Sequence, residues 1–105
     1  MGFAMSEQER GVVTVIRLAG ELDMASAPSL QTTVDELVSL GHCRIVLDLT
    51  ELTFCDSAGL NAFIRGDRRC QPHGGWLRLQ HAGGHVARVI RLSGIDHLLT
   101  YHGDD

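Results

Sequence analysis

Ser57 stands beside a carboxylate at the start of a helical pattern, a place where a hydroxyl can do several kinds of chemistry. The stretch FCDSAGL, residues 54–60, follows an apolar run. A serine there can cap the helix, act as a nucleophile or accept a phosphate. With Asp56 available as the cap, Ser57 falls in the first turn with a free hydroxyl. A phosphate at that position would meet backbone N–H groups and the positive end of the helix dipole.

A catalytic role for Ser57 is disfavoured by its neighbours. The nucleophile elbow of serine hydrolases is G-x-S-x-G, but Cys55 and Asp56 precede Ser57 in this chain. Six histidines are present, yet spacing places none of them beside Ser57 as the base that a nucleophile needs. We therefore expect no catalytic residue and no enzyme activity.

Metal and cofactor sites find no better support. His81 with His85, and His42 with Cys43, form only pairs, whereas a zinc site takes three or four converging ligands. The three cysteines show no C-x-x-C spacing, and their odd number disfavours a disulfide framework. We expect solvated histidines, cysteines that fill core space in a reducing cytoplasm, and no metal or cofactor.

Composition excludes further classes of partner. The formal net charge is -4 and the chain has no lysine, which argues against a surface that neutralises nucleic-acid phosphates. No stretch approaches the roughly 18 to 20 apolar residues of a membrane span, and the N-terminus lacks the pattern of a signal peptide. At 105 residues the chain fits a single domain, which we expect to be cytoplasmic and to bind neither nucleic acid nor membrane.

Apolar periodicity predicts strands that carry the loop with Ser57. Residues 12–18 are rich in β-branched side chains, and residues 76–80 alternate between apolar and polar types. Residues 44–49 form a short apolar run, which is typical of a central parallel strand buried on both faces. Residues 3–7 are expected to pair with residues 12–18 as an antiparallel hairpin, with the polar QERG as its loop.

Three helices are expected between and after these strands. The first begins near Ser26, ends at Gly41 and buries Leu30, Val34, Leu37 and Val38. The second begins at Asp56 or Ser57 and buries Leu60, Phe63 and Ile64, with Arg65, Asp67, Arg68 and Arg69 in solvent. The third follows the AGG at residues 82–84, ends at Gly94 and buries Val86, Val89, Ile90 and Ser93.

The alternation of strands and helices predicts an α/β fold with a mixed, mostly parallel sheet of four to five strands and helices packed on it. The chain is expected to be one domain with its core at about residues 11–102. Residues 95–102 would form a final turn or short strand, and residues 103–105 a polar tail.

The order of these features resembles the STAS domain, and specifically the bacterial anti-sigma factor antagonists. The resemblance is carried by GELD at residues 20–23, by VLDLTELTFCDSAGL at residues 46–60 and by HVARVIRLSGIDHLLTYH at residues 85–102. The last stretch is similar to the family's final helix and closing strand. The match spans nearly the whole chain, and its most specific part is the strand followed by DSAGL.

The resemblance implies a regulatory switch. Ser57, the serine of the D-S-x-G-L signature, would be phosphorylated by an anti-sigma factor that is also an ATP-dependent serine kinase. The unphosphorylated protein would bind that partner and free the sigma factor. A serine phosphatase of the metal-dependent type would reset the switch. The protein is then a kinase substrate that is monomeric when free, and not an enzyme.

The resemblance also implies a partner surface around this serine. The expected contacts are Asp23, Met24, Ser26, Thr50, Asp56, Ser57, Ala58, Gly59 and Asn61. A phosphate on Ser57 would lie beside Asp56 and near Asp23 and Asp48, so that repulsion weakens the complex.

Several roles on this surface stay open in the sequence. Gly59 serves either partner approach or close packing on the sheet, and Ser26 serves as a contact or only as a cap. Thr50 is a lesser candidate phosphosite in the same loop, and Cys55 stands where a small apolar residue is expected. The alternative function is a STAS accessory subunit of a lipid or anion transporter, which binds an ATPase without any phosphorylation.

Overall fold

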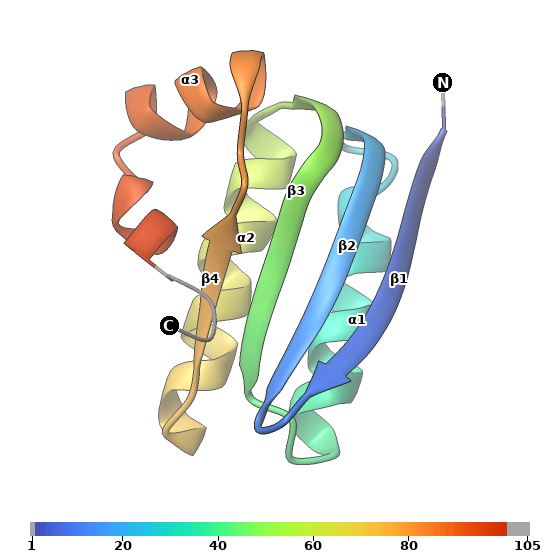
Figure 1. Ribbon diagram of the computed structural model, residues 1–105, viewed down its shortest axis with the longest axis vertical. Coiled ribbons are helices and arrows are strands. Elements are labelled where there is room, and N and C mark those ends of the chain that lie inside the picture. The colour runs from blue at the N-terminus through green and yellow to red at the C-terminus, as the bar shows by residue number, and fades with distance from the viewer. Residues whose placement is uncertain (1, 101–105) are drawn as a thin grey trace.

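A computed structural model describes residues 2–100, in which strands and helices alternate after an initial hairpin (Figure 1). The strands are β1 (Phe3–Arg10), β2 (Val13–Leu22), β3 (Arg44–Cys55) and β4 (Trp76–Gln80). The helices are α1 (Ala27–Ser39), α2 (Ser57–Cys70) and α3 (Gly84–Leu92), with the 3-10 helices η1 (Gln71–His73) and η2 (Asp96–Thr100).

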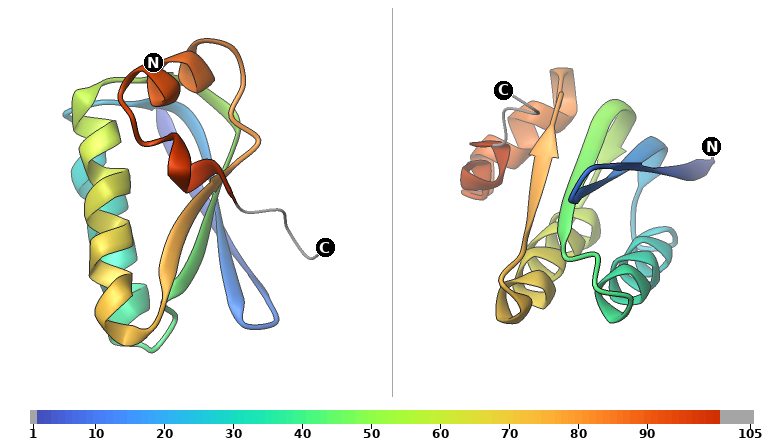
Figure 2. Two further views of the ribbon diagram at one scale, coloured as in Figure 1. Left: turned by 90° about the vertical axis from the view of Figure 1, so that its left-hand side faces the viewer. Right: turned by 60° about the horizontal axis from the view of Figure 1, so that its bottom comes forward.

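The sheet has the strand order β1-β2-β3-β4. β1 runs antiparallel to β2, whereas β3 is parallel to both of its neighbours. The predicted mixed sheet, with a central parallel strand and an antiparallel edge, is therefore confirmed. Because both crossover helices follow parallel strands, α1 and α2 lie side by side on one face of the sheet and begin at the same end of the molecule (Figures 1 and 2).

The hydrophobic core lies between the sheet and these two helices. The predicted stripe of α1 is buried, and Phe63 of α2 has no exposed surface. Facing strand residues complete the core, among them Ile16, Leu18, Ile45, Leu47 and Leu49. α3 and η2 lie beside β4, at the edge of the sheet opposite to β1 (Figure 1). No helix within residues 2–100 is long and apolar enough to span a membrane.

The first three strands are longer than predicted. β1 continues to Arg10, so only Gly11 and Val12 connect it to β2. Gly20 does not end β2, which continues to Leu22 through two irregularities in its pairing with β3. At φ +95° a Cβ on Gly20 would collide with the backbone of Gly2. This glycine therefore marks a bulge and a close backbone approach instead of a strand end.

β3 likewise runs through TELTFC to Cys55, where a loop was expected. Its added length pairs with the extended end of β2, and the Thr53 hydroxyl donates a hydrogen bond of 3.0 Å to the Gly20 carbonyl. The residue types of this stretch suggested a loop, but an available partner strand satisfies its backbone groups.

Burial differs from prediction at a few helix positions. Asp67, predicted to face solvent, is buried where α2 packs on β4. Its carboxylate accepts hydrogen bonds from the Leu77 N–H at 2.9 Å and from Arg78 at 3.0 Å. Leu60 is only half-buried, and Ser93 is exposed with its hydroxyl donating to the Ile90 carbonyl.

The end of the described chain forms the 3-10 helix η2, so the predicted turn, and not a strand, follows Gly94. Ile95 and Leu98 bury their side chains there. The remainder of the stretch 95–102 and the predicted polar tail at 103–105 lie outside the described residues.

Candidate functional site

The N-terminus of α2 is capped by Asp56, as predicted. Asp56 has an extended backbone (φ -107°, ψ -169°), and its Oδ1 accepts hydrogen bonds from the N–H groups of Ala58 at 2.9 Å and Gly59 at 3.2 Å. These two donors have no partner inside the helix. One carboxylate therefore completes the cap.

Ser57 is the first residue of α2 and is exposed to solvent. None of the hydrogen bonds formed within residues 2–100 involves its hydroxyl, and no histidine there is bonded to it. The hydroxyl therefore has no base to activate it as a nucleophile. It is, however, open to a second protein, at a helix end that favours a negative charge.

Gly59 allows α2 to approach the sheet closely. A Cβ at this position would lie 2.6 Å from the Cys55 Sγ and 2.9 Å from Cδ2 of Leu22, closer than real contacts. Of the two roles considered for Gly59, close packing is the one that the geometry supports. Cys55 itself is buried, and burial followed by the nearby Asp56 carboxylate raises the pKa of its thiol to about 12. It is a protonated core residue, which disfavours a redox role.

The loop between β2 and α1, residues 23–26, is held by its own side chains. Oδ1 of Asp23 accepts from the N–H groups of Ala25 at 2.9 Å and Ser26 at 3.1 Å. The Ser26 N–H bond is the main cause of a lowered pKa for the Asp23 carboxyl. Ser26 occupies the cap position of α1, but its hydroxyl donates to the Glu21 carbonyl and makes no capping bond, so the predicted capping role is wrong.

This loop meets the start of α2. The Asp56 N–H donates to the Leu22 carbonyl at 3.2 Å, and the side chain of Met24 is 79% exposed. A groove of about 460 Å³ lies between α1 and α2 and begins at this point. The predicted contact residues that line it are Met24, Ala58 and Asn61.

The other residues that line the groove were not among the predicted contacts, and they are Ala27, Pro28, Gln31, Thr32, Ala62 and Arg65. Arg65 had been predicted only as part of a solvated helix face. The sequence alone could not identify these lining residues, because the groove depends on the tertiary arrangement in which α1 and α2 lie side by side (Figure 2).

Thr50 lies on β3 and not in the Ser57 loop, which corrects the prediction. At about 3.3 Å per residue, the strand between Thr50 and Asp56 separates Thr50 from Ser57 by roughly 20 Å. Its hydroxyl donates to Oδ1 of Asp48 at 2.6 Å. Asp48 is further still from Ser57, so its carboxylate does not repel a phosphate there.

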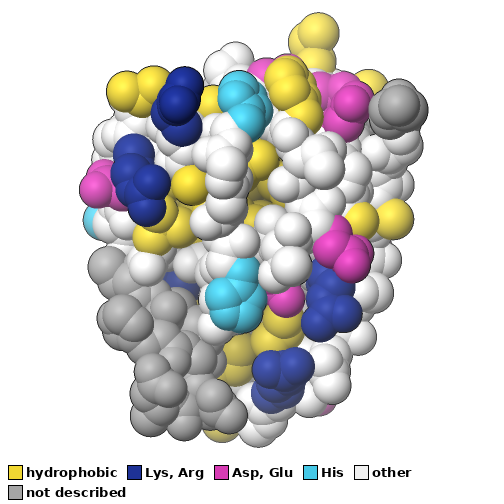
Figure 3. Space-filling model, turned by 45° about the horizontal axis from the view of Figure 1, so that its top comes forward, with side chains coloured by type: hydrophobic (Ala, Val, Ile, Leu, Met, Phe, Trp, Pro, Cys, Tyr) yellow, Lys and Arg dark blue, Asp and Glu magenta, His cyan; other side chains and the backbone are white. Residues whose placement is uncertain are grey.

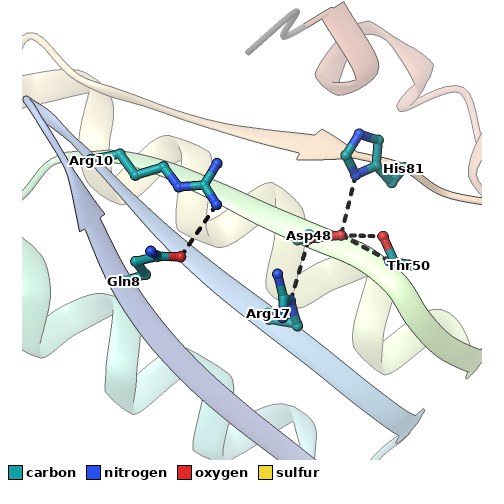
Figure 4. A network of polar contacts seen from close by, with 6 residues as sticks. All are labelled: Gln8, Arg10, Arg17, Asp48, Thr50 and His81. Carbon is teal, nitrogen blue, oxygen red and sulfur yellow. Dashed lines mark hydrogen bonds and ion pairs between the residues drawn. The ribbon is translucent and has the colours of Figure 1, made fainter. Parts of the chain in front are cut away.

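Asp48 is instead the centre of a separate polar network on the sheet (Figure 4). Its carboxylate lies 3.5 Å from Nε of Arg17 and 3.5 Å from Nδ1 of His81. Burial alone would raise the pKa of Asp48, but the hydrogen bonds from the hydroxyl and N–H of Thr50, together with the nearby His81 and Arg17, lower it. The network links β2, β3 and the end of β4.

The end of the molecule that carries Ser57 presents a mixed surface. Phe54 is 39% exposed and stacks on the ring of His85, with ring centroids 5.8 Å apart. Figure 3, in which this end is turned toward the viewer, shows apolar side chains among histidine and acidic ones. Within residues 2–100 no three side chains of the metal-ligating types come together in a metal site.

Comparison with known proteins adds an independent finding. The family model described as "Mlab, STAS domain" matches residues 5–100. The anti-sigma F factor antagonist of Paenibacillus polymyxa is 29% identical over 100 residues, which cover 94% of this chain and 85% of that protein.

Solved structures show the same fold. The anti-sigma factor antagonist SpoIIAA in its unphosphorylated form is 23% identical with a TM-score of 0.82, over 90% of this chain and 84% of that one. The Bacillus cell fate determinant SpoIIAA in the phosphorylated form gives a TM-score of 0.73 at 23% identity, over 90% of this chain and 87% of that one.

Proposed function

The chain belongs to the STAS domain family, and we propose that it is an anti-sigma factor antagonist switched by phosphorylation of Ser57. In this proposal the unmodified protein binds an anti-sigma factor that is also a serine kinase, and the sigma factor is released. Phosphate on Ser57 ends the binding, and a metal-dependent serine phosphatase restores it. The protein acts as a binding partner and a substrate.

The observation that carries the proposal is that Asp56 and Ser57 have different roles at the start of α2. Asp56 supplies the cap to two helix N–H groups, whereas the Ser57 hydroxyl is exposed and has no hydrogen bond within the described residues. Phosphorylation therefore breaks no bond that holds the fold. A modification site of this kind can change binding while the domain stays folded.

The expected effect of the phosphate is electrostatic and steric. Phosphorylation adds about -1.5 to -2 charges beside Asp56, on a surface that would otherwise present a neutral hydroxyl. A switch from 99:1 to 1:99 occupancy needs a difference of about 5.5 kcal/mol between the two forms. Electrostatic repulsion and steric bulk can supply a difference of this size if Ser57 lies in a desolvated part of the interface with the kinase. A charge at the solvated rim of an interface contributes less.

The names of similar proteins support the general role in this proposal. The similar curated protein carries the name of an anti-sigma F factor antagonist, and SpoIIAA has been solved both with and without phosphate. The match covers most of both chains, so the similarity extends over the whole domain.

The proposal is tested with anti-sigma factor kinases purified from the chain's own host. Each kinase is incubated with ATP and with wild type, Ser57→Ala or the control Thr50→Val. We expect one kinase to label wild type and Thr50→Val but not Ser57→Ala. Label that persists in Ser57→Ala moves the site elsewhere. Absence of label with every kinase, together with copurifying transporter subunits, would favour the accessory-subunit function.

A further inference from the structure

We propose that the groove between α1 and α2 binds an acidic segment of the anti-sigma factor kinase, and that Arg65 pairs with a carboxylate of that segment. This inference rests on the proposed function, since it names the surface that the Ser57 switch controls. The groove starts at Met24 and Ala58, directly beside Ser57, and reaches along α2 to Arg65. Docking surface and phosphorylation site are therefore continuous.

The hollow shape follows from the residues that the two helices turn toward each other. Ala27 of α1 and Ala58 and Ala62 of α2 all line the groove, and their short side chains leave about 460 Å³ unfilled. The other lining residues include the polar Thr32 and Asn61. The space suits an extended segment with small or medium side chains more than a flat protein face.

The charge of the groove is opposite to that of the chain as a whole. Among the described residues, Arg65 is the one charged residue that lines it, while the formal net charge of the protein is -4. Arg65 is exposed and forms no ion pair within residues 2–100. α1 and α2 also begin at the Ser57 end of the groove (Figure 2), so the positive ends of both helix dipoles point there.

A neighbouring arginine on α2, unlike Arg65, forms an ion pair with α1. Arg69, one turn further along α2, pairs with Asp35 of α1 at 3.4 Å. Asp35 also accepts a hydrogen bond from Gln31 at 3.1 Å. Asp35 is engaged by these two side chains, and Arg65 has no acidic partner among residues 2–100, so its guanidinium is open to a carboxylate of another protein. Charge complementarity therefore selects an acidic occupant.

The position of Ser57 beside the groove also explains how a single phosphate weakens binding along the whole groove. A phosphate on Ser57 would stand at the entrance of the groove and repel the same carboxylates that Arg65 attracts. Binding of the kinase in the groove and the presence of a phosphate on Ser57 then exclude each other through charge. Release of the kinase follows without any change of fold.

The test uses the kinase that labels Ser57, with ADP so that no phosphate is transferred. Calorimetry compares its affinity for wild type, Arg65→Glu and the matched control Arg68→Glu, which makes the same charge change on an exposed position of α2 outside the groove. We expect Arg65→Glu to weaken binding about tenfold or more and Arg68→Glu to stay within about twofold. Circular dichroism verifies that each variant is folded.

A second variant fills the groove without touching the phosphorylation site. Thr32 lies exposed on α1 and lines the groove, so Thr32→Trp should also weaken kinase binding. We expect KM for phosphorylation of Ser57 to rise while kcat stays unchanged. Equal affinities of Arg65→Glu and Arg68→Glu, together with wild-type binding by Thr32→Trp, would overturn the inference.

The outcomes separate the groove from the switch. If wild type is labelled and bound but Arg65→Glu behaves as Arg68→Glu, the groove proposal fails and the Ser57 switch stands. If no kinase binds or labels wild type, the proposed function fails and the groove proposal fails with it. If Arg65→Glu abolishes self-association and leaves kinase affinity unchanged, the occupant is a second copy and the proposed partner is wrong.

Discussion

Asp56 and Ser57 are adjacent, yet their substitutions should affect different properties of the protein. The Asp56 carboxylate accepts hydrogen bonds from the N–H groups of Ala58 and Gly59, whereas the Ser57 hydroxyl accepts or donates none within residues 2–100. Asp56→Ala should therefore lower the free energy of unfolding, while Ser57→Ala should leave it unchanged and abolish labelling by the kinase.

The magnitudes follow from the two roles of Asp56. Loss of a helix cap costs about 1 kcal/mol, and loss of a negative charge at a helix N-terminus costs a further 0.3 to 1 kcal/mol, roughly. Asp56→Ala should thus destabilise by about 1 to 2 kcal/mol. Asp56→Asn, which keeps an acceptor but loses the charge, should cost less than about 1 kcal/mol. Ser57→Ala and Ser57→Asp, at an exposed first-turn position, should stay within about 0.5 kcal/mol of wild type.

Urea denaturation followed by circular dichroism measures these differences. A loss of 1 kcal/mol corresponds to a melting temperature lower by about 4 to 8 °C in a domain of this size, so thermal melting gives an independent check. If Ser57→Ala is as destabilising as Asp56→Ala, then Ser57 shares the capping role and a phosphate would disturb the fold. That result would refute the separation of cap and switch.

Other substitutions test the packing and the polar networks. Gly59→Ala should destabilise the fold by about 1 to 3 kcal/mol through overpacking, and the better helix propensity of alanine should offset about 1 kcal/mol of this loss. Adding Cys55→Ala to the same chain removes the clashing Sγ and should restore part of the loss, as measured by urea denaturation. Asp67→Ala should lower the free energy of unfolding by about 3 kcal/mol, because the buried N–H of Leu77 loses its acceptor and Arg78 loses its ion pair; a loss under about 1 kcal/mol would show that water replaces the carboxylate. The lowered pKa of Asp48 stabilises the fold above the unfolded-state value of about 3.8, and this contribution is lost as the pH falls through the folded-state pKa. The stability advantage of wild type over Asp48→Asn should therefore shrink below pH 3.8, and an advantage that does not change with pH would exclude this linkage. Thr50→Val should reduce the same pH dependence by removing the hydroxyl that bonds to the carboxylate.

Features that depend on nearby residues were predictable from the sequence. The cap at Asp56 and the free hydroxyl at Ser57 require only the residue types of the first helical turn. The buried stripe of α1 and the alternation of β4 follow from local periodicity in the same way. Of the predicted contact residues, Met24, Ala58 and Asn61 line one groove, and their role in partner binding stays a prediction.

Features that depend on distant pairing were missed. Gly20 and the polar stretch after Leu49 suggested loop structure, but β2 and β3 extend together because each satisfies the backbone of the other. The burial of Asp67 depends on Arg78, which lies on a strand eleven residues later. Arg65 is exposed and forms no ion pair within residues 2–100, and the sequence alone does not show that α1 and α2 leave a groove beside it.

The most direct measurement compares the affinity of the anti-sigma factor kinase for the unmodified protein and for the protein carrying one phosphate on Ser57. Both forms are prepared from the same wild-type chain, and peptide mapping verifies the position of the phosphate. We predict that the phosphate weakens binding by about ten-thousandfold, which corresponds to the difference of about 5.5 kcal/mol that a complete switch needs, with no change in the circular dichroism spectrum of the domain. Equal affinities of the two forms would contradict the switch at Ser57.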